Sequence, residues 1–285
     1  MTNRLTILKY FTVNEIVELI KGKLFLKFRN AHFKDLQDRE NKLTIILRSD
    51  PSANIKGSEV TANFSLNKKV YQIYLRLNGS DVWVFNQVVL NKGYQYVIQT
   101  FRNYFGNTPM SIIDAGANIG LSILYFKSES PDSHIIGIEP DKENYNCTHQ
   151  NLTANQLSSI TLHHGALWPT KKKLEIVNDF RDMNEWSLRV EENSEGEITS
   201  FTPQEMVSIL HGEVDIFKID IEGGEAKIFE TKGNLDWLKR VRLVVIEIHD
   251  EFSDRKVIVQ ILEDYEFIIF QKGELTIGVN SQLMN

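Results

Sequence analysis

The sequence predicts an α/β fold with a doubly wound, mostly parallel sheet of seven strands, preceded by an N-terminal α+β extension. From about residue 96 onward, strand-like apolar runs alternate with helical segments, as they do in a parallel sheet covered by helices. A glycine-containing turn, Asp114-Ala-Gly-Ala-Asn-Ile-Gly120, joins one such run to a helical stretch, as in a nucleotide-binding domain. We therefore divide the chain into an extension, residues 1–95, and a Rossmann-like domain, residues 96–285.

The extension is expected to begin with helices and to continue with strands. A helical pattern over residues 13–20 is accompanied by basic residues among Leu and Phe. This pattern favours a helical cap on the following domain over a peripheral membrane or partner-binding face. Strands are expected at residues 60–66, 70–77 and 82–85, because turn signals separate these apolar runs. They predict a small sheet or lid ahead of the nucleotide-binding domain.

Seven strands are expected in the second domain, near residues 110–114, 135–139, 160–164, 214–220, 242–249, 265–271 and 274–279. Lys272-Gly273 is a hairpin signal between the last two, which would make one edge of the sheet antiparallel. The polar segment 171–203 is expected to be an insertion or mobile loop beside the site. Residues around Trp186 and Arg189 in this segment are expected to line the acceptor pocket, together with the N-terminal region.

Composition excludes several classes of protein. The chain of 285 residues has a net charge of −6, which gives no general basis for binding nucleic acid. Its single cysteine, Cys147, permits no disulfide within the chain and suits a reducing cytoplasm. No apolar run approaches the ~20 residues of a membrane-spanning helix, and no signal peptide is recognisable. We expect a cytoplasmic protein without a membrane span.

The glycine-containing turn carries a specific chemical signal. Gly116 and Gly120 allow a ligand to lie against the backbone without meeting a Cβ atom. Asp114 stands where a dinucleotide fingerprint has its first glycine, and a carboxylate there would repel a pyrophosphate. It would instead favour the ammonium and sulfonium groups of S-adenosylmethionine. We predict that Asp114, Gly116, Asn118 and Gly120 bind this cofactor; the alternative is an ordinary loop with a helix-capping aspartate.

The next strand supports the same interpretation. It ends in Glu139-Pro140, about 20 residues further on, where an acidic side chain usually binds ribose hydroxyls. Pro140 lacks an N–H group and turns the chain into a helix expected over residues 142–155. Glu139 and Pro140 are therefore predicted to contact the cofactor. As the alternative, Glu139 only caps the following helix.

Two later strands bring polar residues to one edge of the predicted sheet. Strand alternation places Lys218, Asp220 and Glu222 on one face of the first, and Glu247 and His249 on one face of the second. Central parallel strands are normally apolar on both faces, so these charges are expected at the carboxyl ends, where ligands bind. A buried ion pair between Lys218 and Glu247 is the alternative explanation for that pair of residues.

With these motifs the chain resembles the FkbM family of S-adenosylmethionine-dependent methyltransferases. The resemblance covers residues 76–280 and rests on five blocks in the family's order: Asp114 to Gly120, Glu139-Pro140, Gly165-Ala-Leu-Trp168, Lys218-Ile-Asp-Ile-Glu-Gly-Gly-Glu225 and Glu247-Ile-His249. Upstream it includes Ser80-Asp81, Gln87 and Tyr94. Gly224 stands where the family pattern has Ala, and the first 70 residues show no such resemblance.

The resemblance implies a class I methyltransferase fold and O-methylation of a hydroxyl on a sugar, glycan or polyketide-like natural product. His249 is the first candidate for the general base, because an imidazole titrates near neutral pH. Asp220 and Glu222 are the other candidates, and Lys218 would orient one of them. Asp220 is also expected to contact the cofactor.

Four further residues are expected at the cofactor. Ala166 and Trp168, after the third strand, would flank the adenine, although core packing explains Trp168 equally well. Ser80 and Asp81 are expected to contact the cofactor from the segment before the first core strand.

Three alternatives stay open. Asp220, Glu222, Glu247 and His249 offer the ligands for a metal-assisted reaction with Mg²⁺, although we expect no metal. An NAD-linked oxidoreductase would use the same fold, as would a nucleotide-binding module without catalytic activity. The expected partner is a small-molecule or glycan acceptor.

Overall fold

The computed structural model describes residues 4–25, 28, 30–177, 189–230 and 234–284. The chain divides into two compact units, residues 1–90 and 91–285. We describe each unit by itself. Trp186, predicted to line the acceptor pocket, lies outside the described residues. No helix in the described parts of the chain has both the length and the apolar character needed to cross a membrane.

The N-terminal unit combines helices with a small antiparallel sheet. Its helices α1 (Arg4–Leu8), α2 (Val13–Leu24) and α3 (Ala31–Ser49) are followed by β1 (Asn54–Lys56), β2 (Glu59–Leu66) and β3 (Lys69–Arg76). A capping box starts α2, since Thr12 and Glu15 each accept a hydrogen bond from the other's backbone N–H. The expected helix and the first two expected strands are therefore confirmed.

The prediction of a third strand over residues 82–85 was wrong. The segment forms the helix α4 (Asp81–Phe85), which continues into a π-helical turn, η2 (Asn86–Leu90). The Asp81 carboxylate accepts hydrogen bonds from the backbone N–H of Arg76 at 2.7 Å and from its guanidinium at 2.9 Å, which ties the start of the helix to the end of β3. A short apolar run fits a buried helical turn as well as a strand.

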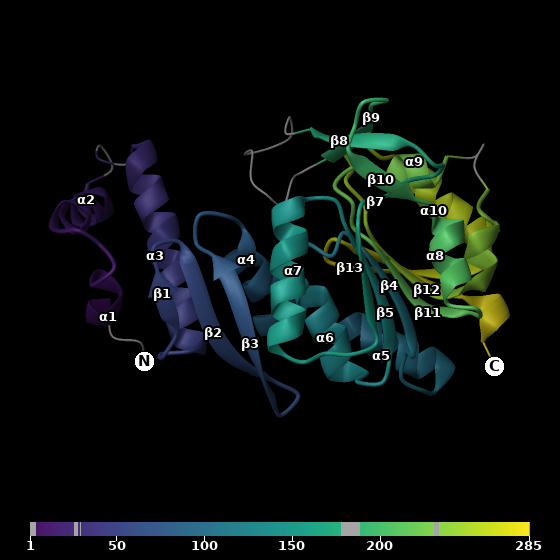
Figure 1. The fold of residues 1–285 in the computed structure, drawn as a ribbon, viewed down its shortest axis with the longest axis horizontal. Coiled ribbons are helices and arrows are strands. Elements are labelled where there is room, and N and C mark those ends of the chain that lie inside the picture. Colours follow the sequence, from purple (N-terminus) through teal and green to yellow (C-terminus); the bar gives the residue numbers. More distant parts are fainter. Residues whose placement is uncertain (1–3, 26–27, 29, 178–188, 231–233, 285) are drawn as a thin grey trace. The chain divides into compact units, whose positions relative to one another are not determined.

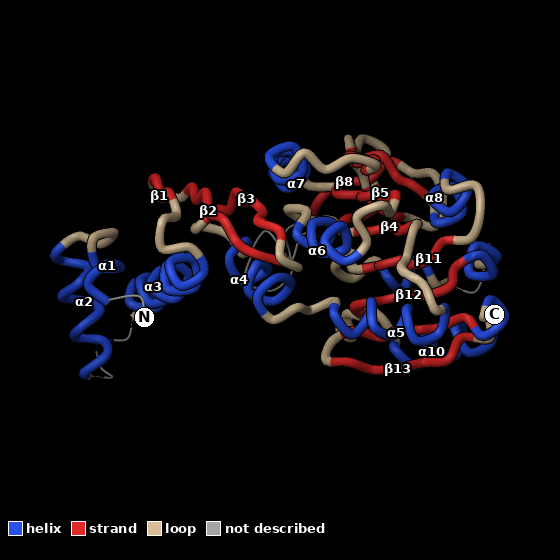
Figure 2. Tube along the Cα trace, turned by 90° about the horizontal axis from the view of Figure 1, so that it is seen from below, coloured by secondary structure: helices blue, strands red, loops and turns tan. Residues whose placement is uncertain are grey.

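The second unit is built on a seven-stranded sheet, shown edge-on in Figure 2. In spatial order the strands are β13 (Phe267–Lys272), β14 (Leu275–Asn280), β12 (Val241–Glu247), β11 (Val214–Ile219), β4 (Ser111–Ala115), β5 (His134–Glu139) and β6 (Ile160–His164). All seven expected strands are present. The hairpin at Gly273 and the antiparallel edge are confirmed, since β14 pairs antiparallel with both β12 and the edge strand β13.

Helices cover both faces of this sheet, so the unit has three layers. The helices of this unit are α5 (Gln95–Phe105), α6 (Leu121–Glu129), α7 (Lys142–Ala154), α8 (Pro203–Ile209), α9 (Glu225–Ile228) and α10 (Arg255–Asp264), with short turns η3 (Asp236–Arg240) and η4 (Ser281–Leu283). Figure 1 shows α6 and α7 on one face and α8 and α10 on the other. Burial on both faces explains the apolar runs of the central strands, in which Ile113, Phe217 and Val244 are fully buried.

Part of the segment 171–203, expected to be an insertion or mobile loop, belongs to a second, four-stranded sheet. Its order is β7 (Ala166–Leu167), β10 (Ile198–Phe201), β8 (Lys173–Val177) and β9 (Arg189–Glu192). The polar residues that suggested a loop occupy the exposed positions of β8 and β9, while Leu174 and Val190 are buried. Alternation over such short strands gives only a weak sequence signal.

The carboxyl ends of β4 and β11 lie side by side because the strands pair in parallel, with Lys218 opposite Asp114. The loops that follow them also touch. A Cβ atom on Gly116 would lie 1.8 Å from the backbone oxygen of Asp220, and Gly116 has φ +80°. Only glycine permits this approach, which brings Asp220 beside the turn after β4.

We expect Gly116→Ala to lower the free energy of unfolding more than Gly106→Ala does. Gly106 also has positive φ (+73°), but a Cβ there meets nothing within 4 Å. The control therefore pays only the left-handed backbone cost, about 1–2 kcal/mol. Gly116→Ala adds a backbone clash worth about 1–3 kcal/mol more. Denaturant unfolding of both variants measures the difference, and equal losses would contradict the close contact.

Candidate cofactor and active site

The turn after β4 is bonded to the end of β5. The backbone N–H groups of Gly116 and Ala117 both donate to the carbonyl oxygen of Ile138, at 3.0 Å each. The backbone N–H of Asn118 donates to Glu139 Oε2 at 2.7 Å. Gly120 starts α6 and packs against Thr148 of α7. The two loops predicted to hold the cofactor are thus joined by hydrogen bonds.

Asp114 does not face the cavity, contrary to the expectation that its carboxylate meets a cationic ligand. It is fully buried and accepts a hydrogen bond from Ser122. Lys218 Nζ lies 3.0 Å from Asp114 Oδ1 and donates to the carbonyl oxygen of Gly116 at 2.8 Å. The negative charge of Asp114 is therefore offset inside the protein. Lys218 pairs with Asp114 and not with Glu247, the alternative that the sequence left open.

Glu139 is placed to accept further hydrogen bonds. Its Oε1 accepts the backbone N–H of Asp141 at 2.9 Å, and its Oε2 accepts that of Asn118. The Asn144 side chain adds a third hydrogen bond, and because a carboxylate has about four lone-pair sites, a ligand hydroxyl could still donate to it. Asp141, not Glu139, is the N-cap of α7. Burial raises the pKa of Glu139 to about 8, against the lowering effect of these backbone hydrogen bonds.

A cavity opens at this edge of the sheet and contains seven of the predicted site residues. Its lining combines the turn after β4, the end of β5, the small sheet and the loop after β11: Gly116, Asn118, Ile138, Glu139, Pro140, Asn144, Ala166, Leu167, Val190, Asp220, Ile221 and Glu222. Ile138, Asn144, Leu167, Val190 and Ile221 were not predicted. Val190 was missed because its strand was expected to be a loop.

Trp168, another predicted cofactor residue, does not line this cavity. Trp168 is buried among the residues of the small sheet, and its indole N–H donates to Glu192 at 3.0 Å. This arrangement is the core packing that the sequence left as an alternative. Ser80 and Asp81 belong to the N-terminal unit, where Asp81 is fully buried against Arg76. Their contact with the cofactor stays a prediction.

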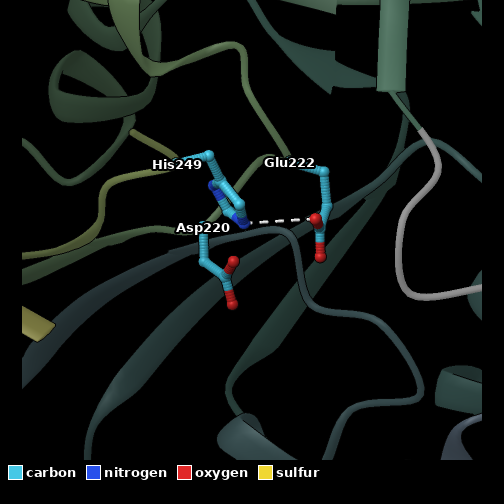
Figure 3. A group of neighbouring side chains, drawn as sticks. All are labelled: Asp220, Glu222 and His249. Carbon is cyan, nitrogen blue, oxygen red and sulfur yellow. Dashed lines mark ion pairs between the residues drawn. The ribbon is translucent and has the colours of Figure 1, made fainter. Parts of the chain in front are cut away.

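A cluster of three side chains follows the carboxyl ends of β11 and β12: Asp220, Glu222 and His249 (Figure 3). One ligand atom from each lies within 4.8 Å of the others. His249 Nε2 is 3.2 Å from Glu222 Oε2, the contact drawn as a dashed line in Figure 3. Asp220 Oδ2 is 3.4 Å from Lys218 Nζ. The expected gathering of polar side chains from β11 and β12 is therefore present.

His249 is held between two carboxylates, and this changes its expected role. Its Nδ1 lies 3.0 Å from Glu225 Oε1, opposite the contact of Nε2 with Glu222. Burial lowers the pKa of His249, but the hydrogen bonds and charges of Glu222 and Glu225 outweigh it and raise the pKa to about 11. An imidazole with this pKa carries a proton at neutral pH and cannot accept another. The surroundings therefore speak against His249 as the general base.

Glu225 was not among the predicted site residues. It is fully buried at the start of α9, and its Oε1 also accepts the backbone N–H groups of Ile221 and Gly223, at 3.2 and 3.4 Å. It thus fixes both the loop that carries Glu222 and the ring of His249. The available signal was a third acidic residue directly after the glycine pair Gly223-Gly224.

The remaining carboxylates are more basic than usual. The charge of Asp220, together with burial, raises the pKa of Glu247 to about 8. Burial also raises the pKa of Glu222, although its hydrogen bond with His249 opposes this shift. Glu222 has φ +53°, a conformation that non-glycine residues seldom adopt and that marks strained functional loops. A carboxylate with a raised pKa is a better proton acceptor.

The metal-assisted alternative would use Asp220, Glu222 and His249, which could together offer oxygen and nitrogen ligands. A histidine must be deprotonated to bind a metal. Both ring nitrogens of His249 contact carboxylates that favour its protonated form. The donor set is therefore better suited to a salt-bridged cluster than to a divalent cation.

The fold and the site together define a class. When the strands of the large sheet alone are numbered 1 to 7 along the chain, their spatial order is 6-7-5-4-1-2-3, and strand 7 is reversed. The cavity lies at the carboxyl ends of the parallel strands. This is the architecture of class I S-adenosylmethionine-dependent methyltransferases. The model of one family, described as "Methyltransferase FkbM domain", matches residues 114–269. The chain belongs to this family, and its cofactor is S-adenosylmethionine.

Known relatives are distant. "Methyltransferase 1" from Beauveria bassiana (strain ARSEF 2860) is 24% identical over 143 residues, 50% of this chain and 55% of that protein, so the chain spans about half the length of the curated relative it matches. Structures with a similar fold include a precorrin-6y C5,15-methyltransferase from Geobacter metallireducens GS-15 (TM-score 0.39, 13% identity, covering 66% of this chain and 89% of that one). Another is magnesium protoporphyrin IX methyltransferase from Synechocystis PCC 6803 with bound S-adenosylmethionine (0.39, 13%, 67% and 80%).

We expect the affinity for S-adenosylhomocysteine to rise with pH up to about 8 and then to level. Ribose hydroxyls donate best to an ionised carboxylate, whereas below its pKa of about 8 the empty Glu139 side chain carries a proton that must leave first. The predicted gain between pH 7 and pH 9 is about tenfold. Calorimetry in buffers of different ionisation enthalpy measures affinity and proton release together. A Glu139→Gln control should lose the pH dependence, and a flat wild-type profile would contradict this assignment.

Glu225→Gln should lower the pKa of His249 from about 11 towards its ordinary value of about 6.5. The amide keeps an oxygen for the backbone N–H groups of Ile221 and Gly223 but removes a buried negative charge beside the ring. NMR titration of the imidazole checks this. The wild-type ring should stay protonated from about pH 6 to 9. A wild-type midpoint near the reference value of about 6.5 would contradict the pairing of His249 with Glu222 and Glu225.

Proposed function

We propose that the protein transfers a methyl group from S-adenosylmethionine to a hydroxyl of a sugar, glycan or polyketide-like natural product. One observation carries the proposal. Two carboxylates, Asp220 and Glu222, line the same cavity as Gly116 and Glu139, the residues best suited to hold the cofactor. An acceptor oxygen next to the cofactor would therefore meet a proton acceptor.

Proton removal is the part of the reaction that falls to the side chains of this chain. Bound S-adenosylmethionine supplies a methyl group activated on a sulfonium centre, so alignment provides much of the rate. Glu222 takes the acceptor's proton as the new C–O bond forms and the methyl C–S bond breaks, with S-adenosylhomocysteine as the leaving group. His249, protonated, holds Glu222 from its other side, and Glu225 holds His249. Lys218 anchors Asp220, which is the second proton acceptor.

The charge of the site supports a neutral hydroxyl acceptor. The negative charge of Asp220 raises the pKa values of Glu222 and Glu247, and the same charge would repel an anionic acceptor. Carboxylates accept hydrogen bonds from hydroxyl groups, which sugars and glycans carry in numbers. We place this activity in the cytoplasm, in keeping with the single cysteine, Cys147, which is buried and free.

Methyl transfer from radiolabelled S-adenosylmethionine to a panel of acceptors tests the proposal. Neutral sugars, oligosaccharides and polyketide-like alcohols should be labelled, and mass spectrometry should locate the label on oxygen. Amine and carboxylate acceptors of matched size serve as controls. Labelling of those controls without any hydroxyl acceptor would overturn the assignment of an O-methyltransferase.

Glu222→Gln should lower kcat by about 10²–10⁴-fold, the usual contribution of a general base. The affinity for S-adenosylhomocysteine should change little, because the substitution keeps the size of the side chain. In the wild type, kcat should fall at acidic pH as the base becomes protonated. The Glu222→Gln variant should lose this acidic limb of the pH profile together with the rate. Asp220→Asn is the matched comparison. If it abolishes turnover while Glu222→Gln does not, Asp220 is the base.

A further inference from the structure

One face of α2 is apolar and exposed. Val13, Val17, Ile20 and Leu24 recur at spacings of four, three and four residues, so they form a single stripe along the helix. Their side chains are 76%, 42%, 52% and 69% exposed. The opposite face packs on α3 through Leu19. Such a stripe is unusual on a surface that meets only water.

Two exposed aromatic residues extend this stripe beyond the helix. Phe25 follows the last residue of α2, and its ring meets that of Phe28 edge-on at 6.1 Å between centroids. Aromatic and aliphatic side chains on one exposed face are typical of helices that lie in a membrane interface. We call Val13, Val17, Ile20, Leu24, Phe25 and Phe28 the α2 stripe.

The charges around the α2 stripe are sorted by sign. Glu15 and Glu18, the acidic residues of α2, are half-buried towards α3, where Arg39 lies 3.6 Å from Glu15 and His32 lies 3.5 Å from Glu18. The basic residues of the helix, Lys21 and Lys23, are exposed.

Lys9, on the preceding segment, is exposed as well, and its ammonium lies over the Tyr10 ring. Lys23 also pairs with Glu40 of α3. The exposed side of α2 is therefore apolar and basic, although the whole chain is acidic.

We propose that the α2 stripe docks on an anionic lipid bilayer, with α2 lying in the plane of the interface. Apolar side chains would enter the headgroup and acyl boundary, and Lys9, Lys21 and Lys23 would face the anionic headgroups. The long aliphatic stems of the lysines allow their ammonium groups to reach the headgroups while the stripe is inserted. This function is separate from methyl transfer and does not depend on it.

Charge complementarity favours a bilayer over a second copy of the chain. The stripe has the spacing of a coiled-coil seam, but exposed Lys21 and Lys23 flank it on both sides. Two copies of α2 would bring the like charges of Lys21 together, because Glu15 and Glu18 are turned towards α3 and Glu40 already pairs with Lys23. An anionic surface meets the same lysines favourably.

Sedimentation with lipid vesicles tests the proposal on the full chain. The protein should bind vesicles of phosphatidylcholine mixed with phosphatidylserine, and should bind pure phosphatidylcholine at least about tenfold more weakly. A Val17→Asp/Ile20→Asp double variant should lose binding by about tenfold or more, because two charges would have to enter the interface. Lys21→Glu should weaken binding to the anionic vesicles only.

Val257→Asp is the matched control, since Val257 is an exposed apolar residue (48%) on α10 of the other unit. It should bind the mixed vesicles like the wild type, and circular dichroism should show all variants folded, because each replaced side chain is exposed. Equal binding of the wild type and the double variant would overturn the proposal. So would a dimer, detected by analytical ultracentrifugation, that the double variant disrupts while vesicle binding is absent.

Discussion

The arrangement of the site depends on one buried ion pair, between Lys218 of β11 and Asp114 of β4. Both side chains are buried, so neither charge is tolerable without the other. The same ammonium binds the carbonyl oxygen of Gly116 and lies 3.4 Å from Asp220. It therefore fixes the glycine turn and the Asp220 carboxylate relative to each other. The missing side chain of Gly116 allows the two loops to touch, and Lys218 holds them there.

A second set of paired charges leads from the buried start of α9 to the cavity. Along this path Glu225, His249 and Glu222 alternate in sign. Glu139 and Glu247 differ from these residues, because no cation is paired with them among the described residues and their pKa values are raised to about 8. Within the described part of the chain, Glu139 is thus free of a paired cation and able to meet hydroxyl groups, whereas Glu222 is held by His249 and its pKa is still raised by burial. This division suits one cavity that binds a ribose and accepts a proton.

The sequence predicted features that rest on local signals and missed those that rest on tertiary contacts. Periodicity located all seven strands of the large sheet, and glycine and proline located the turns beside the cavity. Residues 82–85 became a helix because Asp81 binds the preceding strand, a contact that no local pattern encodes. The small sheet escaped notice because its short strands carry polar residues on their exposed faces.

At the site, residue identity and position along each strand predicted which polar side chains would gather, but not how they would pair. Asp114 was expected to face a cationic ligand, and its buried pairing with Lys218 follows from strand register, which sequence alone does not give. His249 was favoured as a base from its ordinary pKa, whereas two carboxylates hold it protonated. Glu225 was overlooked for the same reason: its role lies in contacts with a loop and a neighbouring strand.

A crystal structure with bound S-adenosylhomocysteine would show directly whether this cavity is the methyl-transfer site. We expect the ribose hydroxyls to donate to Glu139 and the thioether sulfur to face Asp220 and Glu222 across the same cavity. We also expect Asp114 to keep its contact with Lys218 and not to touch the ligand. A ligand bound elsewhere, or with its sulfur turned away from both carboxylates, would contradict the assignment of this cavity as the methyl-transfer site.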